Sequence, residues 1–290
     1  MRQSVWIAVL FAVAGAAPAF AAEATPGGKI LLTNGVSSIE GAAGGGLATW
    51  AVVAGNETVD GVGGKLHATV VELPDYQLRS AGVAAGLFDR VELSYARQEF
   101  DTGKTGAALG LGRGFTFKQD VFGAKLRVLG DAVYDQDRLM PQVAVGVQYK
   151  KNNQGPVIGA VGGRDDSGTD YYVSATKLLL ARSLLVSGTA RLTKANQTGL
   201  LGFGGDREGG YTLQGEGSVG YMISKRLVVG GEYRSKPDNL GFAKEDDAFD
   251  LFVAYAVNPN VSVTAAYVDL GDIATIRDQR GVFLSLQASF

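Results

Sequence analysis

Alternation of apolar and polar residues, in segments of about ten, recurs along this chain and limits its fold more than any other feature. Residues 142–149 alternate Gln, Val, Ala, Val, Gly, Val, Gln and Tyr, and residues 282–290 continue the pattern to the last residue. A period of two is the signature of a β-strand. After Ala22 no segment keeps a helical period. A tilted strand of this length crosses a bilayer.

The connections between these segments alternate in length. Short connections fall at residues 86–90, 180–183, 223–226 and 257–260, whereas long polar ones fall at residues 101–116, 151–169, 194–210, 236–247 and 271–280. Short turns at one end and long loops at the other are typical of outer-membrane barrels. Strands in hydrocarbon satisfy every backbone group only in a closed sheet. We therefore predict an all-β fold, a single closed antiparallel transmembrane β-barrel of about 12–14 strands.

The first 21 residues read as a signal peptide. Arg2 supplies a positive charge, residues 5–17 are apolar, and Ala19-Phe20-Ala21 fits a small-x-small cleavage site. We therefore divide the chain into a signal peptide (1–21), an N-terminal segment (22–46) and the outer-membrane β-barrel (47–290). The middle segment stays open: it is either a first strand, with residues 29–34 as candidate, or an extension into the lumen or the periplasm.

Charge and cysteine usage exclude several classes of protein. Removal of residues 1–21 leaves 26 basic and 29 acidic residues, because Arg2 is the one charged residue removed. This slightly acidic balance argues against a nucleic-acid partner. The chain has no Cys, so it has no disulfides and needs a large hydrogen-bonded framework.

The last strand carries an expected assembly signal. Apolar residues occupy every second position up to the terminal aromatic residue, at Val282, Leu284, Leu286, Ala288 and Phe290. This pattern resembles the signal that the barrel-assembly machinery reads in outer-membrane proteins. Aromatic residues also gather near strand ends, which favours two girdles at the membrane surfaces. We expect the outer-membrane lipid, lipopolysaccharide and the barrel-assembly machinery as partners in the bacterial outer membrane.

Four stretches resemble an uncharacterised bacterial family of DUF3034 type, which is a domain of unknown function. These stretches are residues 39–46, 86–94, 115–123 and 130–136, and the resemblance extends over residues 28–290. The resemblance implies an outer-membrane β-barrel and brings no catalytic residues with it.

Candidate chemical motifs are weak. His67 is the one histidine, and it shares a strand face with Lys65 and Thr69 that we assign to the lumen. A general base there is conceivable, but a polar lumen residue explains it better. The glycine clusters at 110–114 and 202–205 lack the strand–loop–helix context of a phosphate loop, and the acidic run 165–170 lacks calcium-loop spacing. We expect no catalytic residue, cofactor or metal, and no enzyme activity.

Charged residues on the inferred inward faces are the most informative. On the lipid face near the midplane a Lys or Arg costs roughly 2–4 kcal/mol, which favours the inward assignment. The expected lumen charges are Glu92, Lys125, Arg127, Lys150, Arg191, Glu216, Glu232 and Arg234. The basic excess, five against three, favours anions.

Three functions remain open from the sequence. The first is a passive channel for small polar solutes or ions through a polar lumen. The second is a plugged barrel with a structural or loop-mediated binding role. The third, an outer-membrane hydrolase, is disfavoured by the single histidine.

Overall fold

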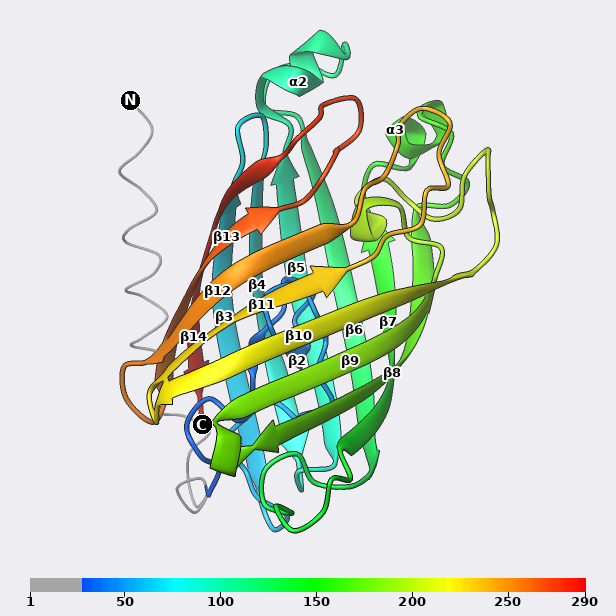
Figure 1. Cartoon of the computed structure of the whole chain (residues 1–290). Helices are drawn as coiled ribbons and strands as arrows, with labels where there is room; N and C mark the ends of the chain where they lie inside the picture. The colour runs from blue at the N-terminus through cyan, green and yellow to red at the C-terminus, as the bar shows by residue number, and fades with distance from the viewer. Residues whose placement is uncertain (1–27) are drawn as a thin grey trace.

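Twelve antiparallel strands form one closed barrel in the computed structural model, which describes residues 28–290 (Figure 1). Each strand pairs with its neighbours in sequence, and the ring closes where β14 pairs with β3 from Val282↔Glu72 to Ser289↔Lys65. The closed sheet has no edge, so its backbone groups are paired within the sheet. The predicted fold is confirmed, at the lower end of the expected strand number. The signal peptide predicted for residues 1–21 lies outside the described residues.

The barrel strands follow the order of the chain. They are β3 (Val62–Glu72), β4 (Gln77–Leu87), β5 (Val91–Asp101), β6 (Thr116–Leu129), β7 (Gln142–Asn152), β8 (Ser167–Leu179), β9 (Leu184–Thr193), β10 (Thr212–Ser224), β11 (Leu227–Arg234), β12 (Ala248–Ala256), β13 (Val261–Asp269) and β14 (Arg280–Ser289). The connections contain α2 (Gly103–Ala108), α3 (Gly155–Ala160), η1 (Leu180–Arg182) and η2 (Asn196–Gly199). The strands β1 (Val36–Ser37) and β2 (Ala43–Gly44) form a separate hairpin.

The two faces of the barrel have opposite chemistry. Outward positions are apolar and exposed, as at Val147, Leu251 and Leu284, so this face suits hydrocarbon. Exposed aromatic residues form an outer girdle of Phe122, Tyr149, Tyr171, Tyr211, Tyr233, Phe249 and Tyr267, and an inner group of Phe88, Tyr221 and Tyr255. Phe100 near the end of β5 and Phe252 at the centre of β12 are instead buried inside the barrel.

The two ends of the barrel differ in loop length, as expected. The end with α2 and α3 carries the long connections, whereas the other end carries the C-terminus and most of the short turns (Figure 1). By analogy with other barrels, we call the long-loop end outer and the other end inner. Two connections depart from this rule: residues 73–76 form a short outer turn, and residues 130–141 form a long inner loop.

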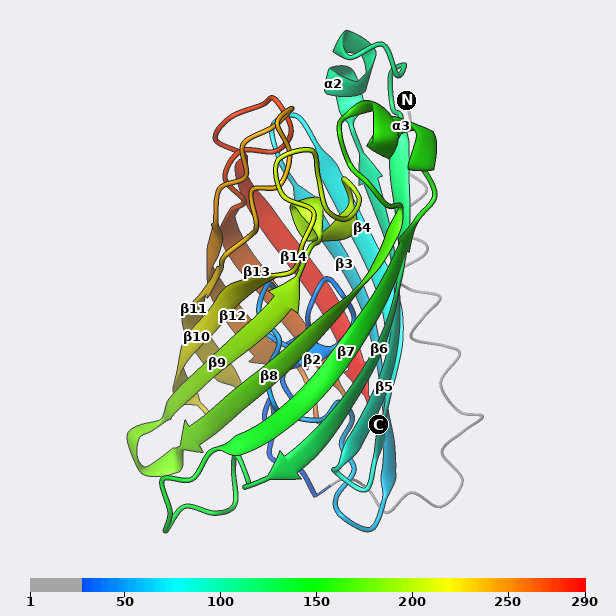
Figure 2. The same cartoon turned by 90° about the vertical axis from the view of Figure 1, so that its right-hand side faces the viewer.

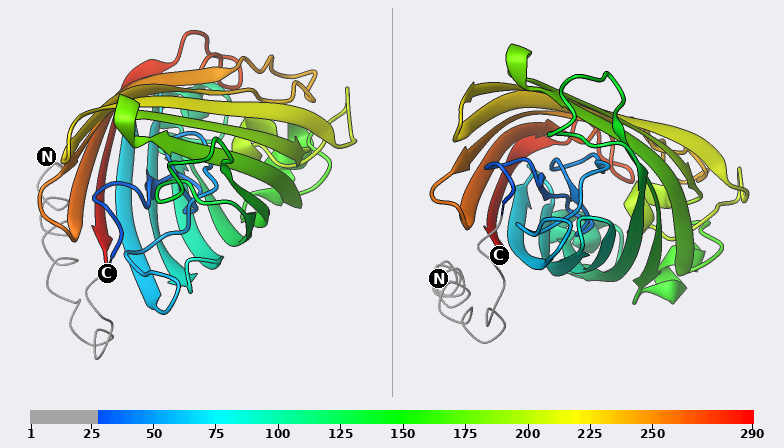
Figure 3. Two further views of the ribbon diagram at one scale, coloured as in Figure 1. Left: turned by 60° about the horizontal axis from the view of Figure 1, so that its bottom comes forward. Right: turned by 90° about the horizontal axis from the view of Figure 1, so that it is seen from below.

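The chain before the barrel lies inside it. Figures 2 and 3 show the N-terminal described residues crossing the interior of the ring. The sequence places the start of the barrel at Leu47, but the first barrel strand begins at Val62. Residues 47–55 are buried throughout and have no lipid-facing side. The candidate strand at residues 29–34 is instead a turn, in which Thr33 N–H donates to the Ile30 carbonyl over 3.1 Å.

No helix among residues 28–290 is long and apolar enough to span a membrane.

The outward assignment of β7 makes a stability prediction. Val147→Arg puts a charge on the lipid face near the middle of the strand, and should lower the free energy of unfolding by roughly 2–4 kcal/mol. Urea unfolding of the protein in lipid vesicles measures this difference. The matched Val147→Leu variant should unfold within about 1 kcal/mol of the wild type. Equal stability of the Arg and Leu variants would contradict the assignment.

Candidate functional site: the filled lumen

Residues 33–55 fill the interior of the barrel, and we call this segment the plug. Every residue of the plug is buried. The hairpin β1–β2 gives it a compact core, in which Val36 pairs with Gly44 and Ser37 with Ala43. Its small residues allow the plug to fit among the long polar side chains of the barrel wall. The site is therefore the contact between plug and wall.

An ion pair of the wall clamps two parts of the plug. Lys125 Nζ lies 3.1 Å from a carboxylate oxygen of Glu92, and both side chains are about 1% exposed. The carboxylate of Glu92 accepts the N–H of Ala43 at 3.1 Å and that of Ala54 at 2.9 Å. Lys125 donates to the carbonyls of Ala43 and Val52. This pair therefore satisfies backbone groups of the plug that are buried inside the barrel.

Two further glutamates hold the centre of the plug. Glu232 accepts the N–H of Leu47 at 2.8 Å, and Glu216 accepts that of Thr49 at 2.8 Å. The approach is close, because a Cβ added to Gly45 would lie 1.7 Å from Glu232 Oε1. A side chain at position 45 would therefore push the Glu232 carboxylate out of its present place against the plug. Charge-assisted bonds of this kind are roughly twice as strong as neutral ones.

One carboxylate of the plug, Glu40, pairs with a cluster of cations on the wall. Arg234 binds it with two hydrogen bonds of 3.0 Å, and Lys150 contacts it directly. Arg191 Nη2 lies 3.8 Å away and also pairs with Glu216. Glu40 is fully buried. Removing one member of such a group leaves unpaired buried charge, which is strongly destabilising.

The expected lumen charges fall into three groups in the structure. Lys150, Arg191 and Arg234 meet at Glu40, with Glu216 beside them, and Glu92 pairs with Lys125. Glu232 binds the plug separately.

Arg127 stands apart from these groups. It lies half-buried at the inner rim, where it pairs with Asp89 and Asp131. Arg127 lies away from the lumen centre because it is at the inner end of β6, one residue past the last pair with β5, Val91↔Leu126, and next to the turn at Asp89.

Three residues of the network were not among the expected lumen charges. Lys65 donates to the carbonyls of Asn34 and Gly35, and Asp170 lies 2.7 Å from Lys150 Nζ. The alternation in β3 does indicate an inward position for Lys65, because it lies on the same strand face as His67. Glu40 lies in a Gly/Ala-rich stretch with no period, so its partners could not be read from the sequence.

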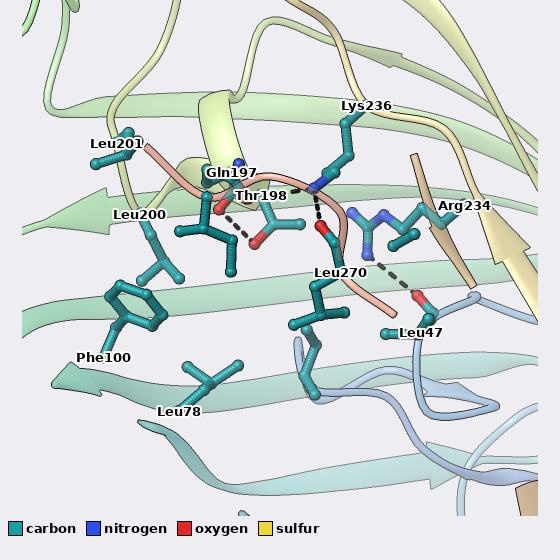
Figure 4. Close-up of a pocket in the computed structure, with 13 residues that line it drawn as sticks. Leu47, Leu78, Phe100, Gln197, Thr198, Leu200, Leu201, Arg234, Lys236 and Leu270 are labelled. Atoms are coloured by element: carbon teal, nitrogen blue, oxygen red, sulfur yellow. Dashed lines mark hydrogen bonds between the residues drawn. The ribbon is translucent and has the colours of Figure 1, made fainter. Parts of the chain in front are cut away.

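A small apolar cavity lies between the plug and the outer loops (Figure 4). Its volume is about 50 Å³. Leu47 of the plug, Phe100 of β5 and Leu270 of an outer loop line it. Gln197 and Thr198 cover it from η2, with left-handed backbone angles of φ 44° and 59°. Lys236 donates to Gln197 and to the Leu270 carbonyl, so three outer loops join above the plug.

The remaining candidate motifs show no organised chemistry. His67 is buried, with Nε2 3.2 Å from Ser80 Oγ, while the Ser80 hydroxyl donates to the Ile39 carbonyl of the plug. The carboxylates of the 165–170 run diverge, because Asp165 pairs with Lys194 outside and Asp170 points into the lumen. Residues 28–290 contain no cluster of three His, Cys, Asp or Glu able to hold a metal ion.

The expected assembly strand forms the outward face of β14. Val282 and Leu284 are exposed, and Leu286, Ala288 and Phe290 are partly exposed. The Phe290 carbonyl accepts the N–H of Asn56 at 2.9 Å and that of Gly64 at 3.2 Å. The C-terminus is thus joined to the chain that leaves the plug. Its reading by the barrel-assembly machinery stays a prediction.

Comparisons with known proteins agree with the architecture. The family model described as "Protein of unknown function (DUF3034)" matches residues 33–287. Among curated proteins, none matches the sequence. The "KdgM porin" structure has a TM-score of 0.50 at 10% identity, covering 78% of this chain and 99% of that one.

Two further solved structures are more distant. "NanC porin" has a TM-score of 0.48 at 11% identity, covering 78% of this chain and 98% of that one. The outer membrane protein Omp33 of Acinetobacter baumannii has a TM-score of 0.42 at 9% identity, with 78% and 97% covered. The likeness to the "KdgM porin" structure, together with the closed ring of strands, shows the fold of an outer-membrane β-barrel. At these identities the likeness concerns fold alone.

From the Glu40 cluster we expect that the loss of this one charge strongly destabilises the folded protein. Glu40→Gln removes the buried carboxylate that Lys150 and Arg234 share and leaves only Asp170 and Glu216 to balance the wall cations. It should lower the free energy of unfolding by about 3–5 kcal/mol. Urea unfolding measures this loss. Glu99→Gln, which breaks an exposed pair with Lys118, is the control and should cost less than about 1 kcal/mol. A Glu40 effect no larger than the control would refute the clamp.

A second prediction concerns pH at the inner rim. Burial raises the pKa of Glu57 to about 7, although Lys29 lies only 3.2 Å away. The folded state therefore keeps the Glu57 proton at pH values where the unfolded state, with a pKa near 4.5, has lost it. This contribution to stability is present below pH 4.5 and is lost as pH rises through about 7.

The matched variant for this prediction is Glu57→Gln, which imitates the protonated side chain. Unfolding free energies of wild type and variant, measured in urea from pH 4 to pH 8, should diverge over this range. The wild type should lose stability relative to the variant as pH rises. Parallel curves would show that the burial of Glu57 has no such effect.

Proposed function

The chain belongs to the DUF3034 family, whose function is unknown, and from its lumen we propose that it is an outer-membrane channel for small polar solutes or ions that its own plug keeps closed. The observation that carries the proposal is the filling of the lumen by residues 33–55, all buried. The passive channel expected from the sequence cannot conduct while the plug occupies this position. Opening requires displacement of the plug.

The polar character of the contact supports a displaceable plug. Apolar packing would stabilise a permanent plug at least as well as ion pairs, because the desolvation of buried charges offsets much of their attraction. Here charged side chains such as Glu92, Lys125 and Arg234 bind plug backbone instead. The same side chains become the hydrated lining of a pore once the plug leaves, as a polar lumen requires.

The charges of that lining nearly balance. Five cations face the plug: Lys65, Lys125, Lys150, Arg191 and Arg234. Five carboxylates face it as well: Glu92, Asp170, Glu216, Glu232 and Asp250. The opened pore should therefore select weakly between anions and cations, and the anion preference expected from sequence is not retained.

A second candidate is a permanently plugged barrel that binds a partner through its outer loops. It is favoured by the interlocked outer loops: Gln197 N–H donates to Glu245 at 2.6 Å, and its amide donates to the Asp272 carbonyl at 2.9 Å. In this case the loops close the outer mouth whatever the plug does. A hydrolase has no supporting observation at His67.

Planar-bilayer recording of the refolded protein tests the proposal. The wild type should stay closed, with rare steps at most, because the plug fills the lumen. Deletion of residues 36–54 should give steady conductance steps, and Glu40→Gln should give intermittent ones because it weakens the hold on the plug. Each variant is first checked for a folded, heat-modifiable barrel on gels.

The outcomes separate the two candidates. Silence of both folded variants would remove the channel and leave the permanently plugged barrel. Steady wild-type conductance equal to that of the deletion would show that the plug does not close the pore. The Lys225→Ala variant, in an exposed inner turn, is the control and should behave as the wild type.

A further inference from the structure

Two rows of charged side chains cross the outward face of β4–β7 near its outer end. Each row runs across three adjacent strands in register, with a carboxylate between two cations. The first row is Arg79, Glu99 and Lys118, and the second is Arg97, Asp120 and Lys151. We call these six residues the outer charge patch.

Contacts within the patch hold its carboxylates in place. Lys118 Nζ lies 3.2 Å from Glu99, and Arg97 Nη1 lies 2.7 Å from Asp120. The Tyr95 hydroxyl also donates to Asp120 at 2.8 Å. Lys151 makes no ion pair within residues 28–290, and its side chain is exposed. Each row thus holds two cations and one carboxylate.

The patch lies at the level of lipid headgroups. Directly toward the membrane centre from Arg97 and Asp120, Tyr95 packs against Phe122 with ring centroids 5.1 Å apart. Phe122 is in register with Tyr149 on β7. Aromatic rings of this kind mark the membrane interface, so charged residues just above them meet the headgroups.

This concentration of charge is specific to one side of the barrel. The outward positions of β9 to β12, for example Val219, Tyr233 and Leu251, carry apolar residues or Gly and no charge. Solubility of the outer rim would not require such asymmetry. A ligand with clustered negative charge at headgroup level accounts for it, because arginine and lysine bind phosphate through charge-assisted hydrogen bonds.

We propose that the outer charge patch binds the phosphate groups of lipopolysaccharide in the outer leaflet. Neighbouring strands are about 4.8 Å apart, so the two cations of a row lie roughly 10 Å apart. Two rows with a cation at each end can thus engage more than one phosphate of the same glycolipid.

The test measures binding of labelled lipopolysaccharide to the full-length refolded protein in detergent. The Lys118→Ala/Lys151→Ala double variant should bind about twenty-five-fold more weakly, since each cation near an anionic surface contributes about fivefold. Glu99→Gln should bind more tightly, because it raises the positive charge of the patch. A variant that merely disturbs the structure would not change affinity in the opposite direction.

Two controls decide the source of the effect. Lys225→Ala/Arg226→Ala, at the inner end, removes the same charge and should leave binding unchanged. Dephosphorylated lipopolysaccharide should bind the wild type and the double variant alike. Equal loss in both double variants would indicate a general charge effect, and undiminished binding of dephosphorylated lipopolysaccharide to wild type would exclude phosphate recognition. Either result would overturn the proposal, as would unchanged affinity in Lys118→Ala/Lys151→Ala.

Discussion

The absence of water in hydrocarbon is the constraint on which this structure depends. Every backbone N–H and C=O that crosses the membrane needs a partner, and the ring from β3 to β14 supplies it within the sheet. Closure creates an interior, and a chain that fills that interior meets the same requirement. The plug has little regular structure of its own, so its backbone depends on side chains of the wall.

Charged side chains of the wall bind the backbone of the plug. Glu92, Glu216 and Glu232 accept plug N–H groups, while Lys65 and Lys125 donate to plug carbonyls. At Glu40 the roles are exchanged, because here the plug supplies the charged side chain and the wall supplies the cations that bind it. Charges that would otherwise suggest the selectivity of a pore thus have a first role in holding the plug. The same chemistry connects closure to opening, because a charged wall stays hydrated when the plug moves away.

The sequence predicts the barrel well because alternation is a local property. Val145 and Val147 read as outward and Gln148 as inward from their spacing alone, and the structure agrees. The start of the barrel was misplaced, since residues 47–55 are apolar and short enough to resemble a strand. Their burial on all sides depends on the wall around them, which no local pattern contains.

The candidate site could be predicted only in part for the same reason. Alternation places Glu92 and Arg191 inside, but their partners Ala43 and Glu40 lie 49 and 151 positions away, in a segment without periodicity. Arg127 shows the converse error, because it faces inward at the very end of β6, where its partners are the rim carboxylates Asp89 and Asp131. Pairing across such separations is a property of the closed ring rather than of any single strand.

Hydrogen exchange of the plug amides in the refolded, detergent-solubilised protein tests the central claim most directly. The N–H groups of Ala43, Leu47, Thr49, Ala51 and Ala54 donate to side chains of the wall. They should exchange about as slowly as amides of β3 and far more slowly than those of the outer loop at residues 104–113. Exchange of these five amides at the rate of that loop would show that the plug is not held in the lumen.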